Sequence, residues 1–186
     1  MLLRPATLAD AAAVAAVYAP YVRDTVISFE SVPPDEAEMG ARIARTLPRF
    51  PWLVVEDARV RGFAYAGAHR ERTAYRWSVD VSVYVDLGAR RTGLGRQLYG
   101  ALLGLLGEQG YAQAFAGITL PNPASVGLHE ALGFRPVGVF RDVGHKFGSW
   151  HDVGWWQRPL RAPADPPAEP VAFGALGPDV VAGHLG

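Results

Sequence analysis

The sequence predicts a single α/β domain built on one mixed sheet. Its 186 residues are enough for one well-buried core and few for two, and 49% of them are hydrophobic, as in ordinary globular proteins. Segments whose apolar residues recur at helical spacing alternate along the chain with segments that alternate apolar and polar residues. Such an alternation is typical of helices packed on a shared sheet.

The charge balance and the residue types narrow the possible functions. With 18 basic and 18 acidic residues the formal net charge is zero, so we expect neither nucleic acid nor an anionic membrane as a partner. The absence of cysteine excludes disulfides, thiolate metal sites and thiol nucleophiles, and no metal is expected. The N-terminus, MLLRPATLAD, has no apolar signal region, and no run approaches the roughly 18 apolar residues of a membrane span. We therefore expect a cytoplasmic protein.

Two helices are expected in the first quarter of the chain. Residues 7–22 begin with Thr7 as an N-cap and Asp10 three residues later, and apolar residues follow at helical spacing. Residues 33–47 begin with two prolines and carry acids in the first turn, ahead of apolar residues spaced four apart.

Strands are expected next. Residues 52–67 contain two apolar runs around a short turn at residues 57–59, which is typical of a hairpin. Residues 75–85, YRWSVDVSVYV, alternate more regularly, with Trp77 and four valines on one face. The other face carries Ser78, Asp80, Ser82 and Tyr84, so we expect it to meet solvent or a ligand.

The remaining elements complete the sheet and leave a tail. Leucines at helical spacing predict a helix that ends at Gly110, and residues 112–120 and 152–157 are expected to be strands. Residues 121–134 contain a short helix that ends at Gly133. From Ala162 onward the chain has five of its 15 prolines and no lysine or arginine, so residues 162–186 are expected to form an extended or disordered tail outside a domain of residues 1–161.

The turn RRTGLGRQLYG, residues 90–100, has the features of an anion site. Gly93 and Gly95 remove side chains where a backbone must approach a ligand, and the helix beginning near Arg96 directs unpaired N–H groups to the same place. A P-loop would need Gly-Lys-Ser/Thr here, and a dinucleotide fingerprint would need a third glycine where Leu98 stands. A plain glycine turn with solvated arginines stays open as the alternative.

The surrounding pattern resembles a known family. Arg90-x-x-Gly93-x-Gly95 directly after an alternating strand, with Asn122 and LHEALGF downstream, is similar to the acetyl-CoA signature of the GNAT N-acetyltransferases. Six segments, from PWLVVE to KFGSWHDVGWWQR, resemble the phosphinothricin N-acetyltransferase branch in order and spacing over about residues 2–160. The resemblance implies a GNAT fold, with a mixed, mostly antiparallel twisted sheet flanked by helices and a splayed strand pair that binds acetyl-CoA.

The resemblance also implies how acetyl-CoA is held. The main chain around Val83, Tyr84 and Val85 would pair with the pantetheine arm, and Asn122 and Ser125 would lie beside that arm. The pyrophosphate would be cradled by the loop that comprises Arg90, Arg91, Thr92, Gly93, Leu94, Gly95 and Arg96. For Asn122, a plain position at a helix N-terminus before proline is the alternative.

Acetyl transfer to an amine needs a base for the amine and groups that stabilise the oxyanion and the leaving thiolate. Asp80 is expected to be the base, directly or through a water, although glutamate is usual at this place in the branch. Tyr84 and His129 complete the expected catalytic set, with His129 as an acid or part of a proton relay. Packing within GLHEALGF is the alternative for His129.

The acceptor site is expected around HRERTAY. Arg70 and Arg72, two apart on a stretch taken as extended, would point to one side and bind a carboxylate or phosphinate, with Tyr75 close to them. By resemblance, the pocket also includes Phe29, Thr119, Lys146 and Val153. Thr119 and Gly117 depart from the residues usual near the acetyl group.

These observations together predict an enzyme that moves acetyl from acetyl-CoA to the α-amine of a small amino acid or analogue, such as phosphinothricin or methionine sulfoximine. Relatives in the branch are commonly dimers, so a homodimer is expected. A GNAT enzyme for a different small amine and a non-catalytic acetyl-CoA sensor are the alternatives.

Overall fold

The computed structural model describes residues 1–162 and 164–186. The strands are β1 Leu2–Pro5, β2 Trp52–Glu56, β3 Val60–Ala68, β4 Ser78–Val85, β5 Gln113–Leu120, β6 Arg135–Lys146 and β7 Ser149–Pro159. The α-helices are α1 Ala11–Asp24, α2 Glu36–Thr46, α3 Leu94–Glu108, α4 Pro123–Ala131 and α5 Pro178–Leu185. Among the described residues, none of the helices has the length and apolarity that crossing a bilayer requires.

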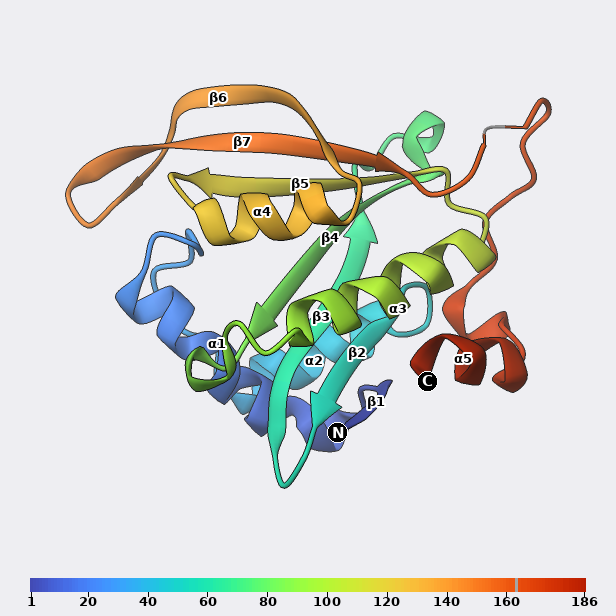
Figure 1. Ribbon diagram of the computed structural model, residues 1–186, viewed down its shortest axis with the longest axis horizontal. Helices are drawn as coiled ribbons and strands as arrows, with labels where there is room; N and C mark the ends of the chain where they lie inside the picture. Colours follow the sequence, from blue (N-terminus) through green and yellow to red (C-terminus); the bar gives the residue numbers. More distant parts are fainter. Residues whose placement is uncertain (163) are drawn as a thin grey trace.

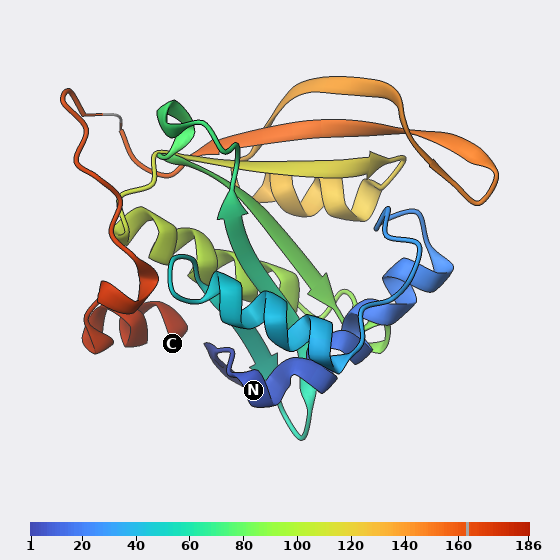
Figure 2. The ribbon, with the colours of Figure 1, turned by 180° about the vertical axis from the view of Figure 1, so that it is seen from behind.

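The strands form one seven-stranded sheet in the order β1-β2-β3-β4-β5-β7-β6. All neighbours are antiparallel except β4 and β5. Helix α3 covers one face, and α1 and α2 cover the other (Figures 1 and 2). The predicted fold class, a mixed and mostly antiparallel sheet flanked by helices, is confirmed.

The expected helix starts are confirmed in detail. The Asp10 carboxylate accepts hydrogen bonds from the main-chain N–H of Thr7 at 2.7 Å and from its hydroxyl at 3.0 Å. A 3-10 turn at Leu8–Asp10 leads into α1. Asp35 caps α2 by accepting from the N–H of Glu38 at 2.8 Å. Both helices therefore begin within a few residues of the predicted signals.

The central strands pack on both faces. On β2, Leu53 and Val55 belong to the hydrophobic cluster under α3, whereas Trp52 and Val54 belong to the cluster under α1 and α2. Burial on both faces explains why residues 52–55 form a continuous apolar run. The expected core face of α3 is confirmed, because Leu98, Leu102, Leu105 and Leu106 are fully buried.

Strands β4 and β5 pair only briefly. Their register joins residues 78–80 to residues 113–115, and beyond Asp80 the two strands diverge (Figure 1). The splayed strand pair implied by the family resemblance is thus present. The remainder of β4 faces a cleft where a neighbouring strand would otherwise lie.

The second half of the tail is folded, in contrast to the extended tail expected from the sequence. Helix α5 packs against α3 (Figure 1). Phe173 is buried in the main core, and Val181 and Leu185 pack against that core. The apolar side chains of the tail gain burial that its proline content does not prevent. The domain boundary at residue 161 stays a prediction.

Candidate active site

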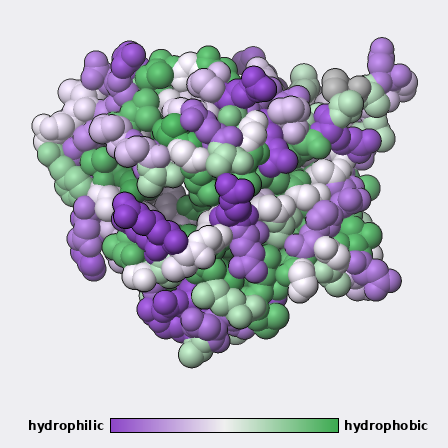
Figure 3. Space-filling view, viewed as in Figure 1, coloured by the Kyte–Doolittle hydropathy of each residue, from purple (hydrophilic) through white to green (hydrophobic). Residues whose placement is uncertain are grey.

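A cleft of about 60 Å³ opens where β4 and β5 diverge. The space-filling view shows a hollow on this side of the molecule, below α4 (Figure 3). Six of the predicted site residues line the cleft: Val83, Tyr84, Thr119, Asn122, Ser125 and His129. The structure therefore gathers residues from β4, β5 and α4 that are far apart in the sequence.

The hydrogen-bond pattern of β4 decides which main-chain groups face this cleft. The N–H of Asp86 donates to the carbonyl of Arg61 at 2.7 Å, and the N–H of His69 donates to the carbonyl of Ser78 at 3.3 Å. Because bonded pairs alternate in an antiparallel ladder, the even-numbered residues of β4 bond to β3. The odd-numbered residues direct their main-chain groups toward β5.

Three valines consequently present main-chain groups to the cleft. Val81, Val83 and Val85 lie beyond the segment that pairs with β5, and the carbonyl of Val85 accepts from the Tyr21 hydroxyl at 2.5 Å. The main chain of Tyr84 pairs with β3 and is therefore directed away from the cleft. The contact of this strand with pantetheine stays a prediction. Sequence reasoning missed Val81, although its odd position on the strand is a usable signal.

The glycine turn leaves main-chain N–H groups free at the start of α3. Gly93 is the N-cap with a φ of 88°, a left-handed conformation that suits glycine. The N–H of Gln97 donates to the Gly93 carbonyl at 3.0 Å, so the N–H groups of Leu94, Gly95 and Arg96 precede the first helical hydrogen bond. These three groups point out of the helix end, as a diphosphate ligand requires.

Side chains of the same loop hold it and add positive charge. Thr92 Oγ1 donates to the carbonyl of Ala89 at 2.6 Å. The Arg90 guanidinium lies 5.3 Å from the centre of the Tyr21 ring, while Arg91 and Arg96 are exposed. The loop therefore combines a fixed backbone with three cations around the free N–H groups.

Asn122 and Ser125 occupy the N-terminal end of α4. The Asn122 side chain accepts from the N–H of Ser125 at 3.2 Å, so it caps the helix, which was the alternative role for this residue. Its side chain also borders the cleft. Both roles are compatible, because the capping oxygen leaves the amide nitrogen free to donate.

His129 is buried, and both of its ring nitrogens have partners. Nδ1 lies 2.7 Å from the carbonyl of Ser125, so it carries the proton, and Nε2 accepts from the Tyr99 hydroxyl at 3.1 Å. Burial lowers the pKa of His129 and raises that of Tyr99. Tyr99 lines the cleft and was missed because it lies within the apolar run of α3. Its position one turn after Gly95 is the signal that points it toward the cleft.

Asp80 lies at the point where β4 and β5 separate, and it is bonded to a histidine that the sequence analysis did not single out. Asp80 Oδ1 lies 2.6 Å from His69 Nδ1. Burial raises the pKa of Asp80, and the hydrogen bond from His69 opposes that rise. The carboxylate is nevertheless 37% exposed, so it remains accessible.

The predicted acceptor residues are only partly brought together. Strand β3 ends at Ala68, and a 3-10 turn covers Thr73–Tyr75, so the stretch that carries Arg70 and Arg72 is not extended as predicted. Arg70 donates to the carbonyl of His69 at 2.8 Å and lies 5.7 Å from the centre of the Trp155 ring. Arg70 and Tyr75 therefore flank His69, while Arg72 is exposed at the start of the turn.

The other predicted pocket residues differ in their roles. Lys146 Nζ donates to the carbonyls of Val22 at 2.6 Å and Ser28 at 2.7 Å, so it ties β6 to the last turn of α1 and to the segment that follows this helix. Two of the three donors of its ammonium group are thereby used within the protein, and the substrate contact of Lys146 stays a prediction. The Phe29 ring packs on Gly144, where a Cβ would collide with it. Val153 lies opposite Thr119 in the sheet, beside the cleft.

The comparisons with known proteins agree with this geometry. Residues 3–155 match the model of the acetyltransferase (GNAT) domain. The chain belongs to the GNAT acetyltransferase family. It is 44% identical to a phosphinothricin N-acetyltransferase of Streptomyces viridochromogenes over 91% of this chain and 93% of that one. It is 38% identical to an L-methionine sulfoximine/L-methionine sulfone acetyltransferase of Pseudomonas paraeruginosa over 83% and 92% of the two chains. The GNAT phosphinothricin acetyltransferase of Sinorhizobium meliloti, solved in complex with acetyl-CoA, superposes with a TM-score of 0.85 at 36% identity and covers 92% of this chain and 97% of its own.

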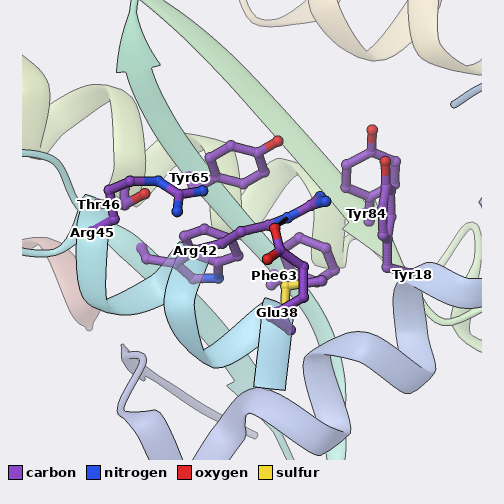
Figure 4. Close-up of a pocket in the computed structure, with 10 residues that line it drawn as sticks. Tyr18, Glu38, Arg42, Arg45, Thr46, Phe63, Tyr65 and Tyr84 are labelled. Atoms are coloured by element: carbon purple, nitrogen blue, oxygen red, sulfur yellow. Dashed lines mark hydrogen bonds and ion pairs between the residues drawn. The ribbon is translucent and has the colours of Figure 1, made fainter. Parts of the chain in front are cut away.

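This GNAT domain has a second cavity, of about 310 Å³, between α2 and strands β3 and β4. Figure 4 shows the Arg42 guanidinium reaching toward the space between Tyr65 and Tyr84. Arg42 bonds to both oxygens of Glu30, at 2.7 and 3.0 Å, so its charge is already neutralised within the protein. Tyr84 lines this cavity as well as the cleft, and its ring packs 4.8 Å from that of Tyr18. Burial raises the pKa of Tyr84, so its hydroxyl stays protonated.

Proposed function

We propose that this GNAT enzyme transfers acetyl directly from acetyl-CoA to the α-amine of a small amino acid or analogue of the phosphinothricin or methionine sulfoximine type. The observation that carries the proposal is the accessible Asp80 carboxylate at the point where β4 and β5 separate. An amine bound there would lie between the carboxylate and an acetyl group held in the cleft. The names of the relatives support this class of acceptor.

The residues suit the steps of the reaction. Asp80 accepts a proton from the ammonium group, directly or through a water, and the free amine attacks the thioester carbonyl carbon. The main-chain N–H group of Val83, which lies beyond the segment paired with β5, is the candidate donor to the oxyanion. The thiolate leaves with the electron pair of the C–S bond toward the part of the cleft lined by Tyr99 and His129. The single Tyr99 hydroxyl proton is donated to His129 Nε2, so the hydroxyl must turn from Nε2 to sulfur to stabilise the thiolate. His129 then acts through Tyr99, because its own Nδ1 proton is bonded to Ser125.

One assay tests the proposal. Release of the free CoA thiol from acetyl-CoA is followed with a panel of amino acids, including phosphinothricin and methionine sulfoximine, and without acceptor as the control. We expect release only with small amino acids or their analogues. Release with a different class of amine would favour that acceptor, and binding of acetyl-CoA with no release for any amine would favour the sensor alternative.

Arg72→Ala is expected to weaken binding of an anionic acceptor. Losing a charge-assisted hydrogen bond of about 1.5–3 kcal/mol should raise the KM of that acceptor roughly 10- to 150-fold and leave the KM of acetyl-CoA unchanged. Initial rates with each substrate varied in turn measure both constants. Arg161→Ala, at an exposed arginine near the tail, is the matched control. An equal loss for both substrates would contradict a role in acceptor binding.

We also propose that the enzyme is a homodimer. Strand β6 is a 12-residue edge strand that is mostly exposed, and it carries Val137, Val139, Phe140 and Val143 at 40–58% exposure. Exposed apolar edges of this kind are usually covered. Sedimentation velocity should give a species of twice the 20.0 kDa chain mass, and Phe140→Glu should convert it to monomer. Val180→Glu, on α5, should leave the dimer intact, and a monomeric wild-type protein would contradict the proposal.

A further inference from the structure

His69 is held in one orientation beside Asp80. Its Nδ1 lies 2.6 Å from Asp80 Oδ1, and because an ionised carboxylate only accepts, the shared proton belongs to Nδ1. The imidazole stacks on Phe115 at 4.2 Å between ring centres. Tyr75 and Trp155 meet it edge to face, at 5.9 and 6.0 Å. The donor is thus fixed on three sides by aromatic rings.

The His69–Asp80 pair lies where the proposed function places the acceptor amine. In the antiparallel register Gly67 faces Asp80, and His69 lies two residues further along, on the same face of the sheet. Phe115 faces Asp80 from β5 at the last paired position before the cleft opens. Among the described residues, the bond from His69 is the one hydrogen bond made by the Asp80 side chain, and it uses Oδ1. Oδ2 is therefore available to a substrate or a water.

A short carboxylate benefits from such a partner. Asp80 is too short to reach far into the cleft, so its usefulness as a base depends on which oxygen faces the amine. A donor fixed at Oδ1 selects one rotamer and favours the ionised form over the protonated one. The other titratable or charged groups around the pair are Arg70, which also favours ionisation of Asp80, and the phenols of Tyr65 and Tyr75.

We propose that His69 is a positioning residue for acetyl transfer, holding Asp80 by Oδ1 so that Oδ2 accepts the proton of the acceptor amine. The inference rests on the proposed function and names how its base works. An N–H bond of the ammonium group breaks, its electron pair stays on nitrogen, and the proton passes to Oδ2, directly or through one water. The amine then bonds to the thioester carbon, and sulfur leaves with the electron pair of the C–S bond. Nitrogen loses its second proton to the thiolate or to solvent, which leaves the neutral amide. His69 keeps its Nδ1 proton throughout, and Asp80 later returns its proton to solvent.

Two variants distinguish the role of the His69 Nδ1–H donor from the role of its aromatic ring. His69→Phe keeps an aromatic ring on Phe115 but has no donor, whereas His69→Asn keeps a donor near the position of Nδ1 and does not titrate. We expect His69→Phe to lower kcat/KM for the acceptor roughly 10- to 100-fold at neutral pH, which is part of the effect of a general base. The acidic limb of its pH profile should move to higher pH, because Asp80 then loses a bond that favours ionisation. His69→Asn should retain most of the activity, and the acidic limb of its pH profile should lie at the same pH as in the wild type.

A measurement without substrate keeps this inference separate from the proposed function. The Asp80 carboxyl is titrated by carbon-13 NMR, with its signal assigned from Asp80→Asn, and its pKa should be higher in His69→Phe than in the wild type. His184→Phe, the same change on α5, is the control and should leave the titration unchanged. If the wild type releases no CoA, the proposed function fails while this titration still tests the pair. An unshifted Asp80 titration in His69→Phe, or equal inactivity of the Phe and Asn variants with an unmoved pH limb, would overturn the inference.

Discussion

Asp80→Asn is expected to lower turnover by roughly 10²- to 10⁴-fold at neutral pH, the range typical of a lost general base. Asparagine keeps the size of the side chain and can still meet His69, but it cannot take a proton from the amine. Raising the pH should recover part of the loss, because more of the acceptor is then present as free amine. Measuring kcat and kcat/KM as a function of pH checks both expectations.

Two further substitutions make this result specific. Asp80→Glu keeps the charge and should be tolerated if the cleft has room for the extra methylene. Asp57→Asn changes an exposed carboxylate in the β2–β3 turn and should leave turnover at the wild-type level. Undiminished turnover of Asp80→Asn with the wild-type pH profile would mean that Asp80 is only a strand residue and that another group, or solvent, takes the proton.

Periodicity predicted the elements that are buried and missed those that are not. Strand β4 and helix α3 each bury one face against the core, so their apolar residues repeat with the period of the element. Strand β6 pairs only with β7 and is mostly exposed, so it has no buried face to impose an alternation. Strand β1 spans only four residues, too few for a pattern. Residues 162–186 were predicted to be extended or disordered because they are rich in proline. Their packing is instead determined by a few apolar residues.

The site could be predicted where one local segment creates it. The free N–H groups of the turn follow from Gly93 and the start of α3, which are contiguous in sequence. Pairs such as His69 with Asp80 and Tyr99 with His129 depend on strand register and helix packing, which a single sequence does not display. The family resemblance led to Lys146, but it could not reveal that two main-chain carbonyls already occupy the ammonium group.

Gly95→Val is expected to abolish measurable binding of acetyl-CoA while the domain stays folded. A Cβ at this position would lie 3.1 Å from Leu128 Cδ2 and 3.9 Å from Val85 Cγ2. Leu128 is a flexible side chain and can shift, so the fold should persist. The two methyl groups of valine would then fill the space where the free N–H groups of α3, the end of β4 and helix α4 converge. Losing two hydrogen bonds to a charged diphosphate would cost about 3 kcal/mol or more, which is a weakening of at least roughly 100-fold.

Gly100→Val is the matched control, because it makes the same change on the same helix. A Cβ at Gly100 meets no atom within 4 Å, so this variant carries the same Gly→Val change in helix propensity without filling the space beside the turn. Titration calorimetry with acetyl-CoA should therefore give wild-type affinity for Gly100→Val and no detectable heat for Gly95→Val, with circular dichroism reporting that both are folded. A folded Gly95→Val protein that binds acetyl-CoA as tightly as Gly100→Val would contradict the assignment of this turn as the pyrophosphate cradle.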